Sequence, residues 1–228
     1  MQLPLDLSHR AARGREDLMV SACNAEAVAL MDRADAWPDA RLALVGPEGA
    51  GKSHMAAVWA GEAGARTLPA DRLPERDPLD LAARPLVVED ADRWLAEGGA
   101  PEPLFHLLNA CARARTPLLL TGRAPPADWP AALPDLRSRL EATTPATIAA
   151  PDDAMLSVLL LKLFADRQLR VAPALIGWLL PRMERSHAAA QRAVAALDAA
   201  ALREGRPVTQ ALARDVLGPD LDSTEGGA

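Results

Sequence analysis

The chain has 228 residues, half of them apolar, and a formal net charge of −6. This length accommodates one α/β domain with a small helical appendage. The mild acidity argues against a protein that binds double-stranded DNA through a basic face. The chain has only seven aromatic residues (five Trp, two Phe, no Tyr), which argues against binding of single-stranded nucleic acid by stacking of bases on aromatic side chains.

The sequence does not begin with the basic residues and apolar stretch of a signal peptide, and the apolar run at residues 158–161 is far too short to span a bilayer. Cys23 and Cys111 lack the spacing of a metal or redox motif. We therefore expect a soluble, cytoplasmic protein that makes no membrane contact.

Between residues 24 and 121 the apolar pattern predicts strands that alternate with helices. Such alternation favours a parallel sheet covered by helices on both faces, which is an α/β fold. A Pro-rich and charged connector is expected at 69–84. The predicted helices are 24–35, 54–60 and 103–115, and the predicted strands are 41–45, 65–68, 85–88 and 117–121.

From Pro151 onward the sequence becomes helical throughout. Pro151 suits the first turn of a helix, and the two aspartates that follow suit its positive N-terminal end. The predicted helices are 151–167, 172–183 and 186–204, with a fourth that starts near Thr209. The first ten residues show no helical period, and the polar residues 219–228 are expected to be a disordered tail.

The first predicted strand runs directly into a phosphate-binding loop of the G-x-x-x-x-G-K-S type. Its glycines let the backbone approach phosphates, and the amides of the following helix hold the anion. Lys52 is one of only two lysines among 25 basic residues, the other being Lys162; its compact ammonium suits the β- and γ-phosphates. Ser53 is expected to reach Mg²⁺. The loop residues are Gly46, Pro47, Glu48, Gly49, Ala50, Gly51, Lys52 and Ser53, followed by His54.

Two carboxylates, Glu89 and Asp90, close the strand predicted at 85–88. Ligands of open α/β folds lie at this edge of the sheet, so one carboxylate there could bind Mg²⁺ while the next orients an attacking water. The usual Mg²⁺ residue is Asp, and Glu89 occupies that register. Shifting by one residue makes Asp90 the ligand and leaves no acid directly after it. Thr121, which ends the strand 117–121, could contact the γ-phosphate or its water.

Three segments together resemble a known family: residues 49–54, residues 121–126, and residues 133–140 with the wording LPDLRSRL. They are similar to the DnaA branch of the AAA+ ATPases and, within it, to the Hda-type regulators of DnaA. The resemblance implies a P-loop domain with a five-stranded parallel sheet at 11–150, followed by a helical lid at 151–218. It covers residues 1 to about 217.

The resemblance also assigns roles to single residues. Arg139 matches an arginine finger offered to a neighbouring ATP site, and Val20 and Asn24 match the segment that lines the adenine pocket. Arg185 is the candidate second sensor, although ungapped counting places Ala188 at that position. The flexible tail 1–10 carries a Q-L-x-L-x-L hexapeptide of the type that docks on the replicative sliding clamp, with anchors Gln2, Leu3, Leu5 and Leu7.

The function that this resemblance implies is regulation of replication initiation. The protein would bind ADP or ATP with Mg²⁺, dock on the sliding clamp, and use Arg139 to promote hydrolysis of DnaA-bound ATP, with little or no ATPase activity of its own. No direct sequence-specific DNA binding is expected, and monomer and homodimer both stay open. A self-sufficient AAA+ ATPase of the helicase-loader type and a nucleotide-stabilised interaction module are the alternatives.

Overall fold

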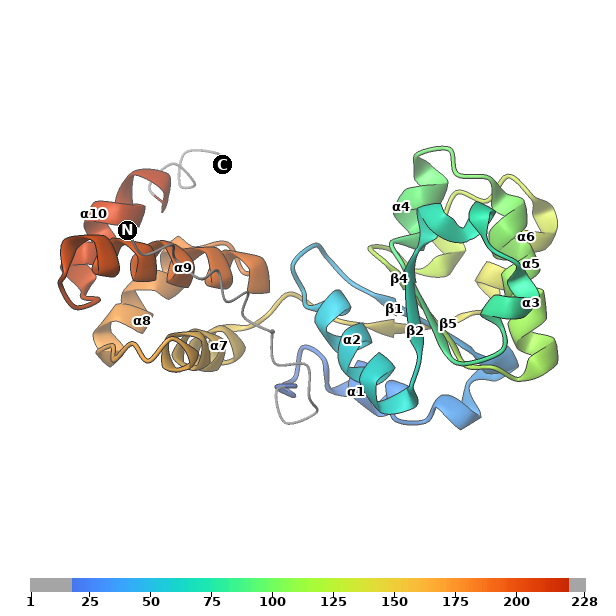
Figure 1. Cartoon of the computed structure of the whole chain (residues 1–228), viewed down its shortest axis with the longest axis horizontal. Helices are drawn as coiled ribbons and strands as arrows, with labels where there is room; N and C mark the ends of the chain where they lie inside the picture. Colours follow the sequence, from blue (N-terminus) through green and yellow to red (C-terminus); the bar gives the residue numbers. More distant parts are fainter. Residues whose placement is uncertain (1–17, 222–228) are drawn as a thin grey trace, which may run out of the picture.

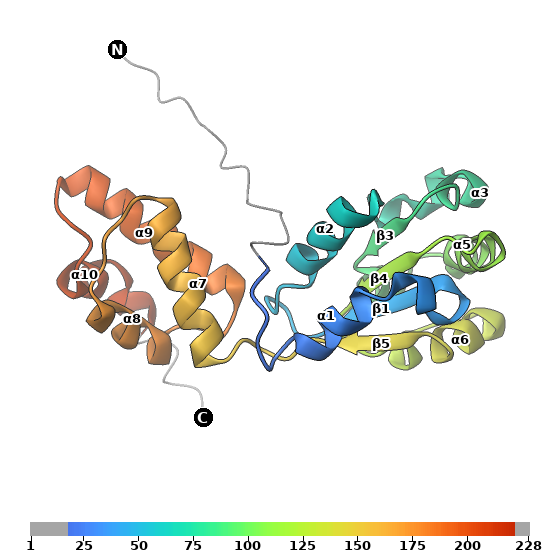
Figure 2. The ribbon, with the colours of Figure 1, turned by 90° about the horizontal axis from the view of Figure 1, so that it is seen from below.

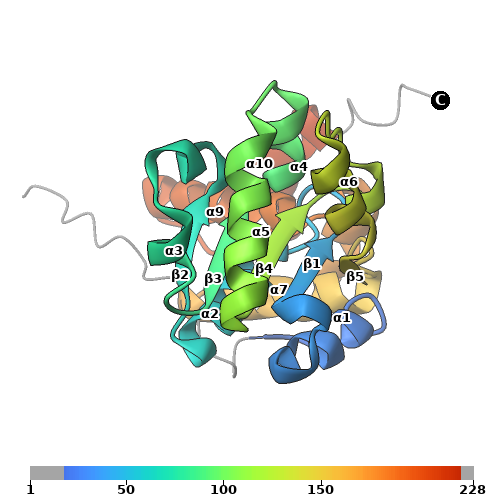
Figure 3. The ribbon, with the colours of Figure 1, turned by 90° about the vertical axis from the view of Figure 1, so that its right-hand side faces the viewer.

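A computed structural model of the chain describes residues 18–221. Within that range five strands form one parallel sheet in the order β2-β3-β4-β1-β5 (Figure 3). The strands are β1 (Arg41–Val45), β2 (Arg66–Pro69), β3 (Leu86–Glu89), β4 (Leu118–Gly122) and β5 (Thr144–Thr147). The predicted parallel α/β sheet is confirmed. The C-terminal ends of β3, β4 and β1, which are neighbours in this order, lie at the same end of the sheet.

Both faces of the sheet are covered by helices, because alternate strand residues point to opposite faces. Leu86 and Val88 of β3 belong to the core on one face, and Val87 belongs to the core on the other. The face with Val87 is covered by α1 (Ala25–Met31) and α2 (Lys52–Ala63). The opposite face is covered by α3 (Pro78–Leu81), α4 (Ala91–Ala96), α5 (Pro101–Ala114) and α6 (Pro134–Glu141).

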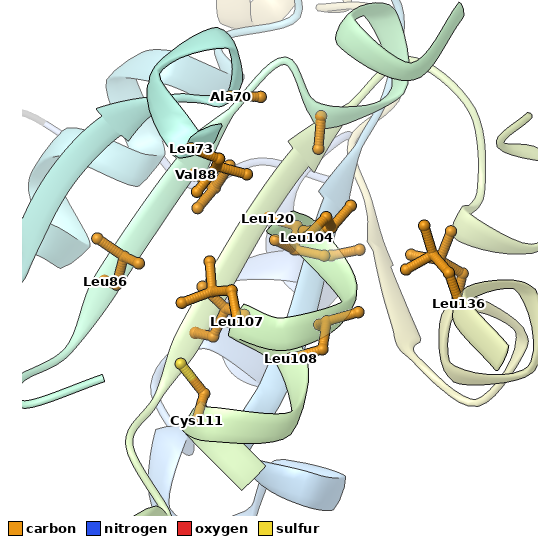
Figure 4. Close-up of a cluster of buried hydrophobic side chains, with 14 of the residues drawn as sticks. Ala70, Leu73, Leu86, Val88, Leu104, Leu107, Leu108, Cys111, Leu120 and Leu136 are labelled. Atoms are coloured by element: carbon orange, nitrogen blue, oxygen red, sulfur yellow. The ribbon is translucent and has the colours of Figure 1, made fainter. Parts of the chain in front are cut away.

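Helix α5 anchors the second of these cores. Its buried residues recur three and four positions apart and pack over β3 and β4 (Figure 4). Cys111 is one of them, and burial raises the pKa of its thiol to about 12. This thiol therefore stays protonated and behaves as a small apolar side chain.

Four further helices form a separate bundle with its own apolar core, which we call the lid (Figure 1). Its helices are α7 (Asp153–Asp166), α8 (Pro173–Leu179), α9 (His187–Glu204) and α10 (Gln210–Leu221). The helix predicted at 172–183 ends early, and a 3-10 turn at Leu180–Arg182 follows it, because Pro181 lacks a backbone N–H. Helix α10 extends to Leu221, so residues 219–221, predicted to belong to a disordered tail, are helical.

Several short elements differ from the prediction. The helix predicted at 24–35 is α1 followed by 3-10 turns at Ala34–Ala36 and Pro38–Ala40. The connector 69–84 contains a 3-10 segment at Ala70–Glu75 as well as α3, and a further 3-10 turn covers Pro126–Asp128. Helices of one or two turns are stabilised by packing and leave little periodic signal in a sequence.

None of the helices within residues 18–221 combines the length and the apolar composition that a membrane span requires. The predicted clamp-binding residues 2–7 lie outside the described residues.

Candidate functional site

The predicted phosphate loop connects β1 to α2 at the edge where the strands end. Gly49 and Gly51 have left-handed φ angles of 75° and 100°, which glycine adopts without strain. No side chain of the described residues caps the N-terminus of α2. The first amides of this helix are therefore open to an anion, as a phosphate site requires.

Lys52 lies inside this loop and is 9% exposed. Its Nζ donates hydrogen bonds to the carbonyl oxygens of Gly46 at 2.8 Å and Pro47 at 2.9 Å. Burial lowers the pKa of Lys52, whereas the nearby charges of Asp90 and Asp92 raise it. The ammonium is thus already held at the loop, and a bound phosphate would compete with these two carbonyls for it.

The ends of β3 and β4 are joined by a hydrogen bond from the backbone N–H of Asp90 to Thr121 Oγ1, at 3.0 Å. Asp90 has a left-handed φ of 55°, an unusual conformation for a residue other than glycine. Glu89, half-buried, is the last residue of β3. The turn at Asp90 starts α4, and therefore places Asp92 close to the loop lysine.

Asp92 and Arg123, which the sequence reading did not select, complete this edge. Asp92 Oδ2 accepts a hydrogen bond from the backbone N–H of Arg123 at 2.6 Å. The side chain of Arg123 pairs with Glu48 of the loop at 2.8 Å, but both side chains are more than half exposed, so this ion pair contributes little stability. Acidic and basic groups from three separate segments therefore surround the phosphate loop.

A cavity of about 730 Å³ lies between the loop and the lid, in the region where α2 faces the lid helices in Figure 2. Its volume falls in the range of small-molecule sites. Three cations line it, namely Lys162 and Arg167 from the α7 side and Arg192 of α9. Its apolar lining consists of Leu18, Met19, Ala50, Met55, Leu159, Leu163 and Ala195. An apolar wall beside cations and open amides suits a nucleoside phosphate.

The lid contacts the loop directly through the start of α9. The backbone N–H of His187 donates to Gly49 O at 2.9 Å, and its Nδ1 lies 3.2 Å from the same oxygen. A Cβ on Gly49 would lie 2.4 Å from the Cβ of Ser186. Position 49 must therefore be glycine for the phosphate loop and the start of α9 to pack at this distance.

Acid should weaken this contact between loop and lid. Desolvation lowers the pKa of His187, aided by the nearby His54 and opposed by the hydrogen bond to Gly49. The unfolded chain therefore binds a proton at higher pH than the folded one, and stability is lost as pH falls through the ordinary histidine value of about 6.5. We expect a lower melting temperature at about pH 5.5 than at about pH 7.5, and a smaller difference for His187→Gln, measured by thermal unfolding.

The exposed His106 of α5 offers a control variant, His106→Gln, which should keep the wild-type difference between the two pH values. An unchanged pH dependence in His187→Gln would contradict the assignment.

Of the residues predicted to bind the nucleotide, Ala50, Gly51 and His54 line this cavity, whereas Val20 and Arg185 are among those that do not. Val20 is 56% exposed, whereas Asn24, which was predicted with it, lines the cavity together with Leu18 and Met19. Arg185 pairs with Asp153 at 2.9 Å, and both side chains are more than half exposed. Arg192, two turns further along the lid, is the arginine of α9 that reaches the cavity wall.

Arg139 lies at the end of the sheet where the strands begin, opposite the end that carries the phosphate loop. It is in the last turn of α6, just before β5, and its carbonyl oxygen accepts a 2.8 Å hydrogen bond from Thr143 Oγ1. Thr143 Oγ1 in turn accepts a 2.9 Å hydrogen bond from Nε of Arg41, the first residue of β1. The phosphate loop follows the other end of β1, and a strand of this length spans about 16 Å. Arg139 therefore does not reach the phosphate loop of its own chain.

No family model and no curated protein matches this chain, but several solved structures share its architecture. Domain III of the replication initiation protein DnaA from Thermotoga maritima superposes with a TM-score of 0.76 at 15% identity, covering 91% of this chain and 96% of that one. The chain has the AAA+ fold.

Two further structures agree with this assignment. AMPPCP-bound DnaA from Aquifex aeolicus gives a TM-score of 0.63 at 16% identity over 75% of this chain and 60% of that chain. A variant of RuvB from Thermotoga maritima gives 0.65 at 15% identity over 86% of this chain and 67% of that chain. At these identities the similarity establishes the AAA+ fold, with its five-stranded sheet and helical lid.

Part of the site could not be predicted from the sequence, because the fold brings residues of the lid to the phosphate loop. Arg192, Arg167 and His187 belong to the lid, far along the chain from the loop, and no short motif marks them. Lys162 is the exception, because a lysine is rare in a chain that uses arginine for nearly all its cations.

Proposed function

We propose that this AAA+ protein is an Hda-type regulator of replication initiation. In this proposal it binds ADP or ATP in the cavity beside the phosphate loop and docks on the sliding clamp through residues 2–7. It then presents Arg139 to ATP held by DnaA and promotes hydrolysis there. The structural likeness to DnaA domain III supports a DnaA-related role.

The residues that line the cavity and the phosphate loop beside it fit a nucleotide. The open amides of α2 and the ammonium of Lys52 suit the phosphates, and the apolar wall suits a base. The solved DnaA from Aquifex aeolicus is bound to AMPPCP, which supports the same ligand class for this chain. Ser53, together with Glu89 or Asp90, would supply oxygen ligands to Mg²⁺, which neutralises phosphate charge when it is bound.

The observation that carries the proposal is the position of Arg139. Arg139 belongs to α6, a helix at the end of the molecule away from the lid (Figure 2), and its guanidinium lies over Phe105 of α5. A nucleotide that it contacts must therefore belong to another chain. A guanidinium placed on the γ-phosphate of a neighbour stabilises the charge that develops during phosphoryl transfer.

The proposal is tested by reconstitution. The protein, the sliding clamp loaded on DNA, and DnaA–ATP are mixed, and conversion of DnaA-bound ATP to ADP is followed. We expect faster conversion only when all components are present. Conversion at the rate of DnaA alone would contradict the proposal.

The position of Asp90 and Asp92 near Lys52 favours one alternative, a self-sufficient AAA+ ATPase. The two functions differ in the turnover of the isolated protein. Steady ATP hydrolysis without DnaA, lost in Asp90→Asn, would support the ATPase. Negligible turnover together with stimulation of DnaA would support the regulator.

Changing Gln2 and Leu3 to alanine should weaken clamp binding about 30-fold or more, because anchor residues of a short peptide carry most of its docking energy. Folding and nucleotide binding should stay unchanged. A surface-binding titration against immobilised clamp measures the effect, and Arg10→Ala, outside the hexapeptide, is the control. Wild-type affinity in the double variant would contradict the clamp assignment.

A further inference from the structure

The side chain of Arg139 does not extend freely from α6. Its guanidinium carbon lies 5.7 Å from the centre of the Phe105 ring, within the range of a cation–π contact. Arg139 and Phe105 are both half-buried. The contact joins two helices, α5 and α6, that pack side by side on the same face of the sheet (Figure 3).

Phe105 is a rigid support for this contact. Its neighbours on α5, Leu104, Leu107 and Leu108, are at most 1% exposed and fix the helix against β3 and β4 (Figure 4). Phe105 itself packs against that core at its edge. A ring held in this way has few alternative rotamers, so its face offers a fixed surface to the guanidinium.

The backbone beneath Arg139 is fixed as well. Thr143 bonds to the carbonyl oxygen of Arg139 and to the side chain of Arg41, which is 2% exposed. Arg41 also pairs with Asp39 at 3.0 Å. Asp39 and Ala40 both adopt left-handed φ angles, 49° and 57°, so this pairing is kept at some cost in backbone strain.

Electrostatic interactions also favour the orientation in which the Arg139 side chain lies over the Phe105 ring. Burial is the largest cause that lowers the pKa of Arg41, its pairing with Asp39 opposes the shift, and the like charge of Arg139 lowers the pKa further. Repulsion therefore disfavours rotamers of Arg139 that turn back toward Arg41, while the negative face of the Phe105 ring attracts it. The two effects select an arrangement in which the guanidinium lies over the ring.

We propose that Phe105 is a positioning residue for Arg139: its ring holds the guanidinium in the orientation with which it enters the nucleotide site of the partner chain. An arginine ordered before docking loses less side-chain entropy in the complex. The inference rests on the proposed function, since it concerns how the same arginine acts in trans.

The test uses the full-length protein in the reconstituted DnaA assay. Phe105→Leu keeps an apolar side chain but removes the ring, and we expect the maximal stimulation to fall about 3- to 10-fold. The protein concentration that gives half-maximal stimulation should change much less, because Phe105 acts on the orientation of Arg139 rather than on docking. Phe105→Tyr and Phe105→Trp keep a ring and should restore stimulation. Arg113→Gln, which alters an exposed side chain two turns further along α5, is the matched control.

A second measurement reports the contact without any assay of hydrolysis. The Nε–Hε proton of Arg139, assigned with Arg139→Lys, should show a ring-current shift in the wild-type NMR spectrum that disappears in Phe105→Leu and persists in Phe105→Tyr. Absence of the shift in the wild-type protein would overturn the inference even if Phe105→Leu failed to fold.

The outcomes separate this inference from the function on which it rests. Full stimulation by Phe105→Leu, with none by Arg139→Ala, would overturn the positioning role and leave the regulator function standing. Equal losses in Phe105→Leu and Phe105→Tyr would also overturn it, because they would indicate a packing role. Full stimulation by Arg139→Ala would overturn the proposed function and this inference with it.

Discussion

Arg139→Ala is expected to reduce the stimulation of DnaA–ATP hydrolysis by about 10³- to 10⁵-fold, the typical contribution of an arginine finger. The variant should still fold, bind nucleotide and bind the clamp. The side chain of Arg139 lies over Phe105 at the edge of the sheet remote from the phosphate loop. Its removal therefore leaves the nucleotide cavity of its own chain intact. Single-turnover hydrolysis of DnaA-bound ATP measures the effect.

Arg137→Ala is the matched control, since Arg137 lies two residues earlier on the same helix. Its side chain is exposed and donates a 3.1 Å hydrogen bond to the Ala131 carbonyl, which ties it to its own chain. We expect this variant to stimulate hydrolysis nearly as well as wild type. Loss of nucleotide affinity in Arg139→Ala would show instead that Arg139 serves its own fold.

Lys52→Ala is expected to weaken nucleotide binding about 10- to 100-fold, because a hydrogen-bonded charge contributes about 1.5–3 kcal/mol to an interaction. Wild-type protein at 1,000 times Kd should gain about 4 kcal/mol of stability from the ligand, and the variant should lose most of that gain. Titration calorimetry with ADP and melting curves with and without ADP measure both effects.

Without nucleotide the same variant should lose about 1 kcal/mol or less, because the cost of burying the ammonium offsets most of what its two hydrogen bonds to the loop carbonyls contribute. Lys52→Arg is the informative control. It keeps the charge but replaces the compact ammonium by a planar guanidinium, and should recover little of the affinity. Wild-type ADP affinity in Lys52→Ala would exclude the phosphate-loop assignment.

Much of the α/β domain could be predicted from the sequence, because its signals are local. The strand expected at 41–45 is β1, Arg41–Val45, and those expected at 85–88 and 117–121 lie within one residue of β3 and β4. Runs of buried apolar residues ended by glycine or carboxylates mark such strands. Helix α4 escaped prediction, since it has six residues and begins after a left-handed Asp90.

The phosphate loop can be predicted from the sequence alone. A glycine-rich turn between a strand and a helix, with Lys52 at its end, is complete within residues 46–53, because the backbone amides of one local segment would form the anion site. Tertiary structure decided everything that depends on segments far apart in the chain. It brought Lys162 and Arg192 of the lid to the cavity, left Arg185 paired with Asp153, and placed Arg139 at the edge away from its own loop. Distances between such segments follow from the packing of helices on the sheet, and no local pattern encodes them.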